Sequence, residues 1–183
     1  MSVSRPALFL DRDGVINVDK GYVSRIEDFE WVSGAAEAIA AFNARNWFVF
    51  VVTNQSGIAR GLFDVETLNR IHSKMRRMLA QVGGKIEAIM FCPHGPEDDC
   101  QCRKPKNGSF VDLAHRLRVN LDNVPAVGDS LRDIQAAMLS QARPILVRTG
   151  KGEKTLAAGI PDGVEVYDDL ASVATALLER KLQ

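Results

Sequence analysis

Two carboxylates near the start of the chain, Asp11 and Asp13, have the type and spacing to do chemistry. They follow a short apolar run at residues 7–10, and residues two apart on an extended chain point to similar sides. Two anions packed together are costly unless a cation or a proton compensates them. The pair is therefore a natural seat for Mg²⁺, and one carboxylate could attack phosphorus. The alternative is a pair of loop-capping aspartates before a turn at Gly14, and this motif alone does not decide between the two.

Three further stretches carry groups suited to phosphate. Residues 53–57 (Thr-Asn-Gln-Ser-Gly) offer hydroxyls, amides and backbone N–H groups for phosphoryl oxygens. Arg103 and Lys104 supply positive charge, which opposes the negative charge that accumulates during phosphoryl transfer. Asp129 and Asp133 add carboxylates after another apolar run. Each stretch alone is also compatible with a helix cap, a surface charge or a turn.

The three cysteines of the chain lie close together with a histidine, as Cys92, His94, Cys100 and Cys102. An odd number of crowded cysteines fits a disulfide framework poorly, whereas three thiolates and one imidazole are the ligand set of a tetrahedral zinc site. Free thiols beside a surface histidine are the alternative, but the polar loop between the ligands favours metal. Because the protein fills all four positions, we expect a structural Zn²⁺ that orders the loop at residues 92–102 and holds Arg103 and Lys104 over the active site.

Short apolar runs alternate with helical patterns along the chain, which predicts a mostly parallel, Rossmann-like α/β sheet with helices on both faces. We expect one domain over residues 1–183. The predicted strands cover residues 7–10, 48–53, 88–91, 124–127, 145–147 and 164–167. The predicted helices run from an N-cap at Ser33 through 42, from a cap at Asp64 to about 83, from a cap at Ser109 through 117, over 131–138, and over 170–182. Ligands of such sheets bind beyond the carboxyl ends of the strands, where the polar groups above are found.

The composition excludes several classes of function. The chain has 183 residues, and its 23 Lys and Arg residues balance 23 Asp and Glu residues, for a formal net charge of +0. A neutral chain lacks the broad basic surface expected of a protein that holds nucleic acid or an anionic membrane, so we expect neither partner. No apolar run approaches the ~18 residues of a membrane span, and the first residues lack a signal-peptide pattern. We therefore expect the protein in the cytoplasm.

Taken together and in this order, the motifs resemble those of the haloacid dehalogenase (HAD) superfamily of phosphohydrolases: Asp-x-Asp after the first strand, Ser or Thr at the second, a Lys, then Gly-Asp-x-x-x-Asp. The resemblance implies that Asp11 is the nucleophile and forms an aspartyl-phosphate. Asp13 would keep a proton to give to the leaving oxygen, and would later deprotonate water. Thr53 and Lys104 would hold the phosphoryl group. Mg²⁺ would lie between Asp11, the backbone carbonyl of Asp13, and Asp129.

Other polar residues have lesser expected roles. Asp133 would orient Lys104 or a metal-bound water rather than bind metal, although an acid in the first turn of a helix needs no such role. Metal binding is not expected to rest on the side chain of Ser130. His72 and His115 are expected to be ordinary residues on helix surfaces.

Within the superfamily, the chain resembles the heptose bisphosphate phosphatase family. The matching stretches are residues 9–14, 17–23, 53–61 and the Cys-x-Cys-Arg-Lys-Pro run at 100–105. The resemblance implies removal of the C7 phosphate of a small sugar bisphosphate during lipopolysaccharide biosynthesis. We expect a monomer, with Mg²⁺ and Zn²⁺ as cofactors. Arg103 is the expected partner of the second phosphate. The implied substrate-contacting residues are Asp11, Arg12, Asp13, Asp19, Lys20, Gly21, Tyr22, Thr53, Asn54, Gln55, Ser56, Arg103 and Lys104.

The sequence leaves three alternatives open. The stretch from Gly14 to Glu30 is too short for a cap domain, and no large insertion separates Thr53 from Lys104, so the site is expected to be open. Histidinol-phosphate phosphatases share this architecture and a similar zinc loop. Polynucleotide 3′-phosphatases also use the scaffold, but the neutral composition disfavours them. A non-catalytic, zinc-stabilised binding module is the most different alternative.

Overall fold

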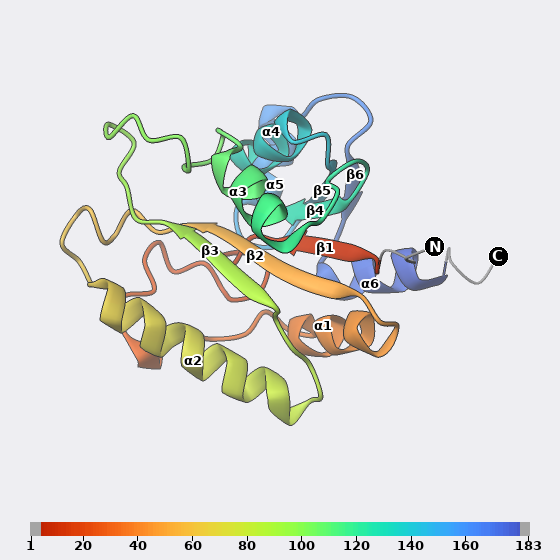
Figure 1. Cartoon of the computed structure of the whole chain (residues 1–183), viewed down its shortest axis with the longest axis horizontal. Coiled ribbons are helices and arrows are strands. Elements are labelled where there is room, and N and C mark those ends of the chain that lie inside the picture. Colours follow the sequence, from red (N-terminus) through yellow and green to blue (C-terminus); the bar gives the residue numbers. More distant parts are fainter. Residues whose placement is uncertain (1–4, 180–183) are drawn as a thin grey trace.

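A computed structural model of the chain, which describes residues 5–179, contains a six-stranded sheet in the order β3-β2-β1-β4-β5-β6. Every pairing within it is parallel, which confirms the predicted α/β class. β1 lies at the centre, between β2 and β4, so residues that follow β1 are flanked on both sides (Figure 1). The strands are β1 Ala7–Leu10, β2 Phe48–Asn54, β3 Ala88–Cys92, β4 Pro125–Gly128, β5 Arg143–Val147 and β6 Glu165–Tyr167.

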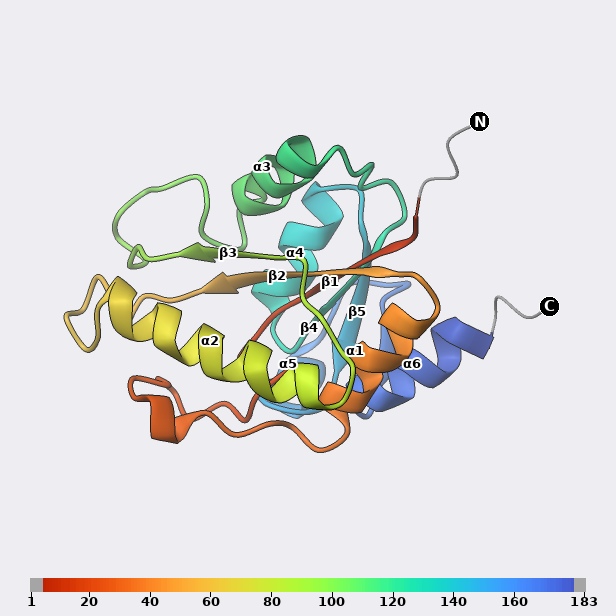
Figure 2. The same cartoon turned by 60° about the horizontal axis from the view of Figure 1, so that its bottom comes forward.

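Helices cover both faces of the sheet (Figures 1 and 2). One layer is formed by α1 Ala35–Ala44, α2 Val65–Gln81 and α6 Leu170–Glu179. The other face is covered by α3 Gly108–Leu117 and α4 Leu131–Leu139. Two short elements, the 3-10 helix η1 Ile26–Asp28 and the helix α5 Gly152–Ala158, lie in the segments that follow β1 and β5. None of the helices within residues 5–179 is long and apolar enough to cross a membrane.

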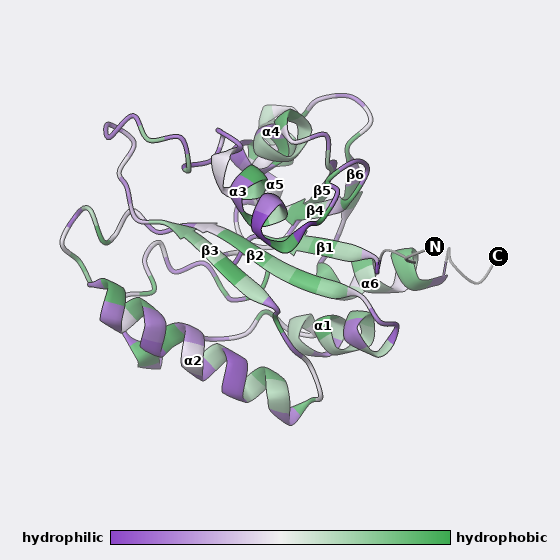
Figure 3. Ribbon diagram, viewed as in Figure 1, coloured by the Kyte–Doolittle hydropathy of each residue, from purple (hydrophilic) through white to green (hydrophobic). Residues whose placement is uncertain are grey.

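The central strands are apolar on both faces because helices cover both. In β1, Leu8 and Leu10 pack with α1, α2 and α6, whereas Phe9 packs with α3 and α4. Phe9 stacks between Phe50 of β2 and Phe110 of α3, with ring centroids 5.1 and 5.4 Å away. In Figure 3 the strands are mainly hydrophobic, whereas α2 carries both hydrophilic and hydrophobic residues, as expected for a helix with one buried face. This two-sided core fixes the strand ends that carry the site.

Most predicted elements are confirmed, and the differences are shifted element ends and two short elements that were not predicted. Asp64 caps α2 as expected, accepting a hydrogen bond from the Thr67 amide at 2.7 Å. The other two predicted caps are wrong. Gly34, in a left-handed conformation, precedes α1 in place of Ser33, and Asn107 precedes α3. The hydroxyl of Ser109 instead donates to the carbonyl of Cys102 at 2.9 Å. Neither α5 nor η1 was expected, and the predicted end of the last helix lies outside the described residues.

Candidate active site and metal centre

A buried lysine links two carboxylates at the carboxyl edge of the sheet. Nζ of Lys104 donates to Oδ1 of Asp11 at 2.9 Å, to Oδ1 of Asp133 at 2.7 Å and to the Val52 carbonyl at 2.7 Å. Lys104 is only 2% exposed. Burial by itself would lower the pKa of Lys104, but the two carboxylates outweigh burial and raise it above its usual value. The ammonium is therefore permanently charged beside Asp11.

Three carboxylates share this region, and one lysine does not balance them. Oxygens of Asp11, Asp129 and Asp133 all lie within 4.8 Å of one another. Burial, followed by repulsion from Asp11 and Asp133, raises the pKa of Asp129 to about 8. Burial also raises the pKa of Asp11 to about 6, against the attraction of Lys104. Hard oxygen ligands carrying uncompensated negative charge fit a divalent cation such as Mg²⁺.

Asp133 differs from the other two carboxylates in that neighbouring protein groups engage both of its oxygens. Its Oδ2 accepts hydrogen bonds from the amide and the hydroxyl of Ser130, at 3.0 and 2.6 Å, while its Oδ1 faces Lys104. Although burial opposes it, the charge of Lys104 and these hydrogen bonds lower the pKa of Asp133. This geometry matches the expected role of orienting Lys104, and it also forms the capping box of α4.

Glycines let two loops close around Asp129. Gly14 has a left-handed φ of 86°, and a Cβ there would collide with the Asp129 carboxylate, as would one at Gly150. The hydroxyl of Thr149 donates to the Gly14 carbonyl at 2.6 Å, joining the loops after β1 and β5. The amide of Lys151 donates to Oδ2 of Asp129 at 2.8 Å. The loop after β5 thus positions the Asp129 carboxylate, although no sequence motif indicated that this loop belongs to the site.

Asp13 is turned away from the other carboxylates and is held by three side chains. Nη2 of Arg12 contacts both of its oxygens, at 2.9 and 3.0 Å, and Asn17 Nδ2 and Gln55 Nε2 donate at 2.9 and 2.8 Å. Burial would raise the pKa of Asp13, but the charge of Arg12 and these hydrogen bonds lower it. The surroundings of Asp13 therefore favour its ionised form, whereas the expected role of proton donor needs the protonated form.

The expectation that His72 lies on a helix surface is wrong. His72 is 6% exposed rather than on the helix surface, and its Nε2 lies 3.2 Å from Nη1 of Arg12. Its position four residues after Leu68 places it on the buried side of α2, a signal that the sequence contained. His115 is exposed on α3, as expected.

The residues at the end of β2 support the site from beneath. Thr53 is buried, and its hydroxyl accepts a hydrogen bond from Gln55 Nε2 at 2.9 Å. Asn54 pairs with the backbone of Lys104: its Nδ2 donates to the Lys104 carbonyl at 3.0 Å, and its Oδ1 accepts from the Lys104 amide at 3.1 Å. The strand β2 thereby fixes the segment that carries Lys104.

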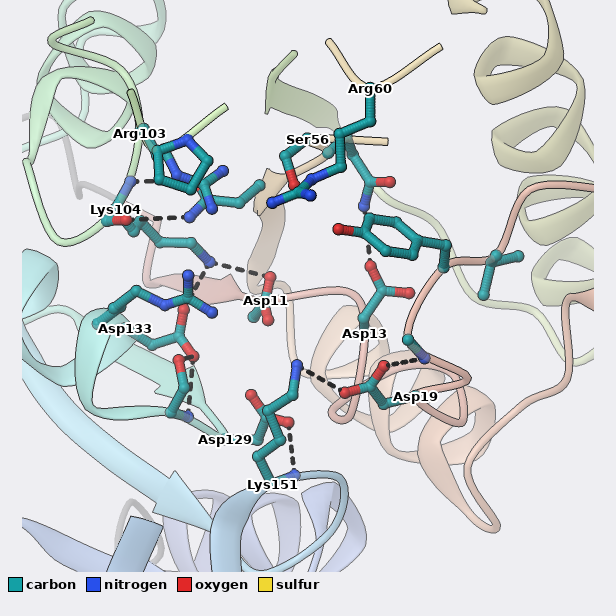
Figure 4. A pocket seen from close by; sticks show the side chains of 18 residues that line it. Asp11, Asp13, Asp19, Ser56, Arg60, Arg103, Lys104, Asp129, Asp133 and Lys151 are labelled. Atoms are coloured by element: carbon teal, nitrogen blue, oxygen red, sulfur yellow. Dashed lines mark hydrogen bonds and ion pairs between the residues drawn. The ribbon is translucent and has the colours of Figure 1, made fainter. Parts of the chain in front are cut away.

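A pocket opens above Asp11, and most of the predicted residues line it (Figure 4). Arg12 and Thr53 are buried beneath it, and Lys20 instead pairs with Glu30 at 3.0 Å. The predicted residues on its wall are Asp11, Asp13, Asp19, Gly21, Tyr22, Asn54, Gln55, Ser56, Arg103, Lys104 and Asp129. Three cations on the wall were not predicted from the sequence, and these are Arg60, Arg132 and Lys151.

The missed cations had weak signals in the sequence. Arg132 lies inside the Gly-Asp-x-x-x-Asp motif, and Lys151 follows a strand end. In the structure Lys151 Nζ pairs with Oδ2 of Asp19 at 2.8 Å, so two loops meet across the pocket floor. Figure 4 shows Asp19 and Lys151 on one side of Asp11, with Arg60 and Arg103 on the other.

The cysteine and histidine side chains converge after β3. Sγ of Cys92 lies 3.6 Å from His94 Nδ1, 3.6 Å from Cys100 Sγ and 3.2 Å from Cys102 Sγ. These distances are too long for disulfides and close to the ligand separations of about 3.7 Å that Zn–S bonds of about 2.3 Å produce in a tetrahedron. The four groups fit Zn²⁺. Nη1 of Arg103 donates to the His94 carbonyl at 3.1 Å, tying the pocket wall to this loop.

Comparisons with known proteins agree with the motifs. A family model described as HAD-hydrolase-like matches residues 101–173. The chain is 54% identical to D-glycero-beta-D-manno-heptose-1,7-bisphosphate 7-phosphatase of Bordetella bronchiseptica, over 94% of this chain and 97% of the relative. It is 44% identical to the enzyme of the same name from Pseudomonas aeruginosa, over 97% and 100%.

Solved structures give the same result. The crystal structure of the D,D-heptose 1,7-bisphosphate phosphatase from B. bronchiseptica, complexed with magnesium and phosphate, superposes with a TM-score of 0.93 at 52% identity, covering 96% of this chain and 99% of that one. The enzyme of that name from Burkholderia thailandensis gives a TM-score of 0.76 at 44% identity, covering 95% and 99%. The chain therefore belongs to the heptose 1,7-bisphosphate 7-phosphatase family of the HAD superfamily.

Proposed function

We propose that the protein hydrolyses the C7 phosphate of D-glycero-D-manno-heptose 1,7-bisphosphate, through an aspartyl-phosphate on Asp11, in the biosynthesis of nucleotide-activated heptose and lipopolysaccharide. The observation that carries the proposal is the pairing of Asp11 with Lys104, 2.9 Å apart, on the floor of a pocket in a chain 54% identical to such an enzyme. A buried carboxylate beside a fixed cation suits attack on a phosphoryl group, because the cation attracts the phosphate that the carboxylate alone would repel.

In this proposal Mg²⁺ is held by Asp11, Asp129 and the backbone carbonyl of Asp13. When bound, the ion supplies positive charge that offsets the phosphate dianion and the carboxylates. The raised pKa values of Asp11 and Asp129 support this assignment, because burial and then repulsion between the carboxylates disfavour the ionised forms that a bound cation would stabilise. Asp133 would remain with Lys104 and Ser130 rather than bind the metal.

The first chemical step forms a bond between a carboxylate oxygen of Asp11 and phosphorus, and breaks the bond between phosphorus and the C7 oxygen. That oxygen leaves with a proton from Asp13. Because its surroundings lower the pKa of Asp13, this carboxylate would acquire the proton as the anionic substrate arrives. A phosphate monoester has a second pKa of about 6, and its negative charge beside Asp13 also raises the affinity of that carboxylate for a proton.

The second step releases phosphate. Asp13, now ionised, accepts a proton from a water molecule, whose oxygen bonds to phosphorus as the bond to Asp11 breaks. The hydrogen bonds from Arg12, Asn17 and Gln55 hold Asp13 in the ionised state that this base needs. Lys104 would neutralise phosphoryl oxygens in both steps, with the hydroxyl of Thr53 as a further donor.

The second phosphate, on C1, would lie at the pocket wall formed by Arg103. One nitrogen of this guanidinium donates to the His94 carbonyl, which leaves its remaining donors for a phosphate. Arg60 and Arg132 line the same pocket and add positive charge. Asp19, Gly21, Tyr22 and Ser56 would contact the sugar. Lys20, which pairs with Glu30, would contribute only by leaving that pair.

Turnover of three substrates tests this function. We expect heptose 1,7-bisphosphate to have a much higher kcat/KM than heptose 7-phosphate, because only the bisphosphate reaches Arg103, and a higher kcat/KM than histidinol phosphate. Arg103→Met should remove most of the advantage of the bisphosphate. The matched control is Arg116→Met, on the exposed side of α3. A higher kcat/KM for histidinol phosphate would contradict the proposed substrate. A protein that is inactive with Mg²⁺ and intact zinc would instead indicate a non-catalytic binding module.

We further propose a monomer that works in the cytoplasm without nucleic-acid or membrane partners. The cations of the pocket surround a small cavity rather than forming a stripe. Three thiols gathered as metal ligands suit a reducing compartment. Light scattering coupled to size-exclusion chromatography tests the oligomeric state: a mass near 20.1 kDa is expected, and a stable dimer would contradict it.

A further inference from the structure

Arg12 lies between the two aspartates of the site in the sequence, but its side chain is fully buried, at 0% exposure. Nη2 of its guanidinium holds both oxygens of Asp13 and lies 3.3 Å from Oε1 of Gln55. Its Nε is buried with no hydrogen-bond partner among the described residues. A buried guanidinium with one unused donor depends on its remaining contacts for its position.

His72 provides the contact on the other side of this guanidinium. Its Nε2 lies 3.2 Å from Nη1 of Arg12, and the two residues are 60 positions apart in the chain. A guanidinium has only donors, so Nε2 must be the acceptor. The proton of the neutral ring is therefore on Nδ1, and the contact fixes both the tautomer and the direction of the ring.

The surroundings of His72 keep it neutral. Burial, and then the positive charges of Arg12 and Arg76, lower the pKa of His72 to about 3 against the opposing attraction of Asp13. A neutral acceptor has a particular advantage here. A carboxylate at the same place would compete with Asp13 for the charge of Arg12, whereas a charged imidazolium would repel the guanidinium.

We propose that His72 is a positioning residue. It holds the Arg12 guanidinium so that Nη2 donates to both oxygens of Asp13. His72 thereby sets the geometry of proton transfer from Asp13 to the leaving oxygen. The inference rests on the proposed function, in which Asp13 transfers that proton. His72 is outside the pocket wall, so it acts on the reaction only through the chain of contacts from His72 to Arg12 to Asp13. Substrate binding should accordingly depend little on it.

Three substitutions separate this role from simple packing. The carbonyl oxygen of Gln reaches about as far from the backbone as Nε2 of His, whereas that of Asn reaches only about as far as Nδ1. His72→Gln should thus retain an acceptor for Nη1, while His72→Asn and His72→Leu should lose it. We expect the latter two to lower kcat for heptose bisphosphate by roughly 10- to 100-fold with KM changed little, as when outer partners of functional groups are removed. His72→Gln should restore most of kcat. His115→Leu, on α3, is the control and should match the unmodified protein.

The leaving group provides a readout that packing alone would not move. An aryl oxide such as p-nitrophenolate leaves without needing a proton, whereas a sugar alkoxide needs one. In single-turnover experiments, His72→Leu should slow phosphoenzyme formation from heptose bisphosphate more than from p-nitrophenyl phosphate. Equal slowing with both substrates, or equal activities of the Gln and Asn variants, would overturn the inference.

Nitrogen NMR of the imidazole gives a test that does not require turnover. We expect a proton on Nδ1 and none on Nε2 of His72 from pH 5 to 8, and loss of this signature in Arg12→Met. A proton on Nε2, or a ring that becomes charged in this range, would overturn the inference even if the protein folds normally. A normal tautomer signature in a protein that does not turn over heptose bisphosphate would instead contradict the proposed function alone.

Discussion

Two clusters of side chains that could hold a metal lie at the same edge of this sheet, and they are built on opposite principles. The aspartate cluster (Asp11, Asp129 and Asp133) brings three hard oxygen donors together around one lysine and opens into the pocket. The cysteine cluster (Cys92, His94, Cys100 and Cys102) brings together four softer donors that complete a tetrahedron. With metals bound, the first would have ligand positions left for a substrate and the second none, so we assign chemistry to the first and a structural role to the second.

The clusters also differ in what holds them in place. The aspartates follow β1 and β4, two paired strands whose positions the hydrophobic core fixes. The cysteine cluster comes from one end of β3 and a loop that has no regular secondary structure between Cys92 and Gly108. We infer that the fold preorganises the aspartate cluster at a cost in repulsion, whereas a metal must order much of the cysteine cluster.

The largest effect should follow from breaking the aspartate cluster at its nucleophile. Asp11→Asn should lower kcat by at least about 10³-fold, because an amide does not form the acyl-phosphate. The same change should raise the melting temperature without Mg²⁺, since it removes one of the repelling charges. Steady-state kinetics and thermal melts measure the two effects, with Asp122→Asn on the surface as control. Robust turnover in the Asp11→Asn variant, or a fall in its metal-free melting temperature, would contradict this view of the cluster.

The cysteine cluster should show the opposite pattern. Cys102→Ser should lower zinc content and melting temperature together, because zinc binding in structural sites contributes on the order of 10 kcal/mol. We expect KM for the bisphosphate to rise more than kcat falls, since the loop carries Arg103 while Asp11 stays in place. Metal analysis, melts and kinetics on one preparation test this, with Ser73→Ala on the exposed side of α2 as control. Unchanged kinetic constants in a verified zinc-free sample would show that the loop at residues 92–102 does not contribute to substrate binding.

The contrast explains how far the sequence could predict this molecule. Apolar runs predict the strands well, and because parallel strands end at one edge, Asp11 and Asp129 could be placed together although 118 positions separate them. The cysteine cluster was also predictable, because its spacing is local. Lys104 is different: its contact with Asp11 depends on how β2 and Asn54 hold the loop, and only the family resemblance indicated it.

Residues whose role depends on one distant partner were harder to predict. The spacing along α2 could have placed His72 on the buried face, but its contact with Arg12, 60 positions away in the chain, could not be read from the sequence. Lys151 follows a strand end, but its contacts with Asp19 and Asp129 require knowledge of where the loop after β5 turns. Ser109 looked like a helix cap, yet the carbonyl of Cys102 takes its hydroxyl.

The dependence of stability on pH should distinguish the clusters more finely. The pKa of Asp129 rises from 3.8 to about 8, so the folded protein keeps a proton that the unfolded chain has lost, and stability falls as the pH approaches 8. His72 acts oppositely, because its pKa falls from 6.5 to about 3, but its contribution is complete above pH 6.5. Between pH 6.5 and 8 without divalent cations, we therefore expect a loss on the order of 2 kcal/mol.

Denaturant titrations across that range measure the loss. Saturating Mg²⁺ should abolish the slope, because it stabilises the ionised carboxylate, and Asp129→Asn should abolish it without metal. The cysteine cluster should be kept loaded with zinc throughout, so that its thiols do not add a slope. Stability that rises between pH 6.5 and 8 in the metal-free protein would show that Asp129 is already ionised there.

The smallest effect should come from the loop that supports the aspartate cluster from behind. Thr149→Val keeps the shape of the side chain but removes the hydroxyl that donates to Gly14 at 2.6 Å, a loss of about 1 kcal/mol. Because Gly14 and Gly150 pack directly against Asp129, we expect Mg²⁺ affinity, measured by titration calorimetry, to fall by roughly five-fold, with zinc content unchanged. Thr149→Ser, which keeps the donor, should behave as the unmodified protein. If both substitutions weaken Mg²⁺ binding equally, the shape of the loop rather than its hydrogen bond positions Asp129, and if neither does, the strand end alone is enough.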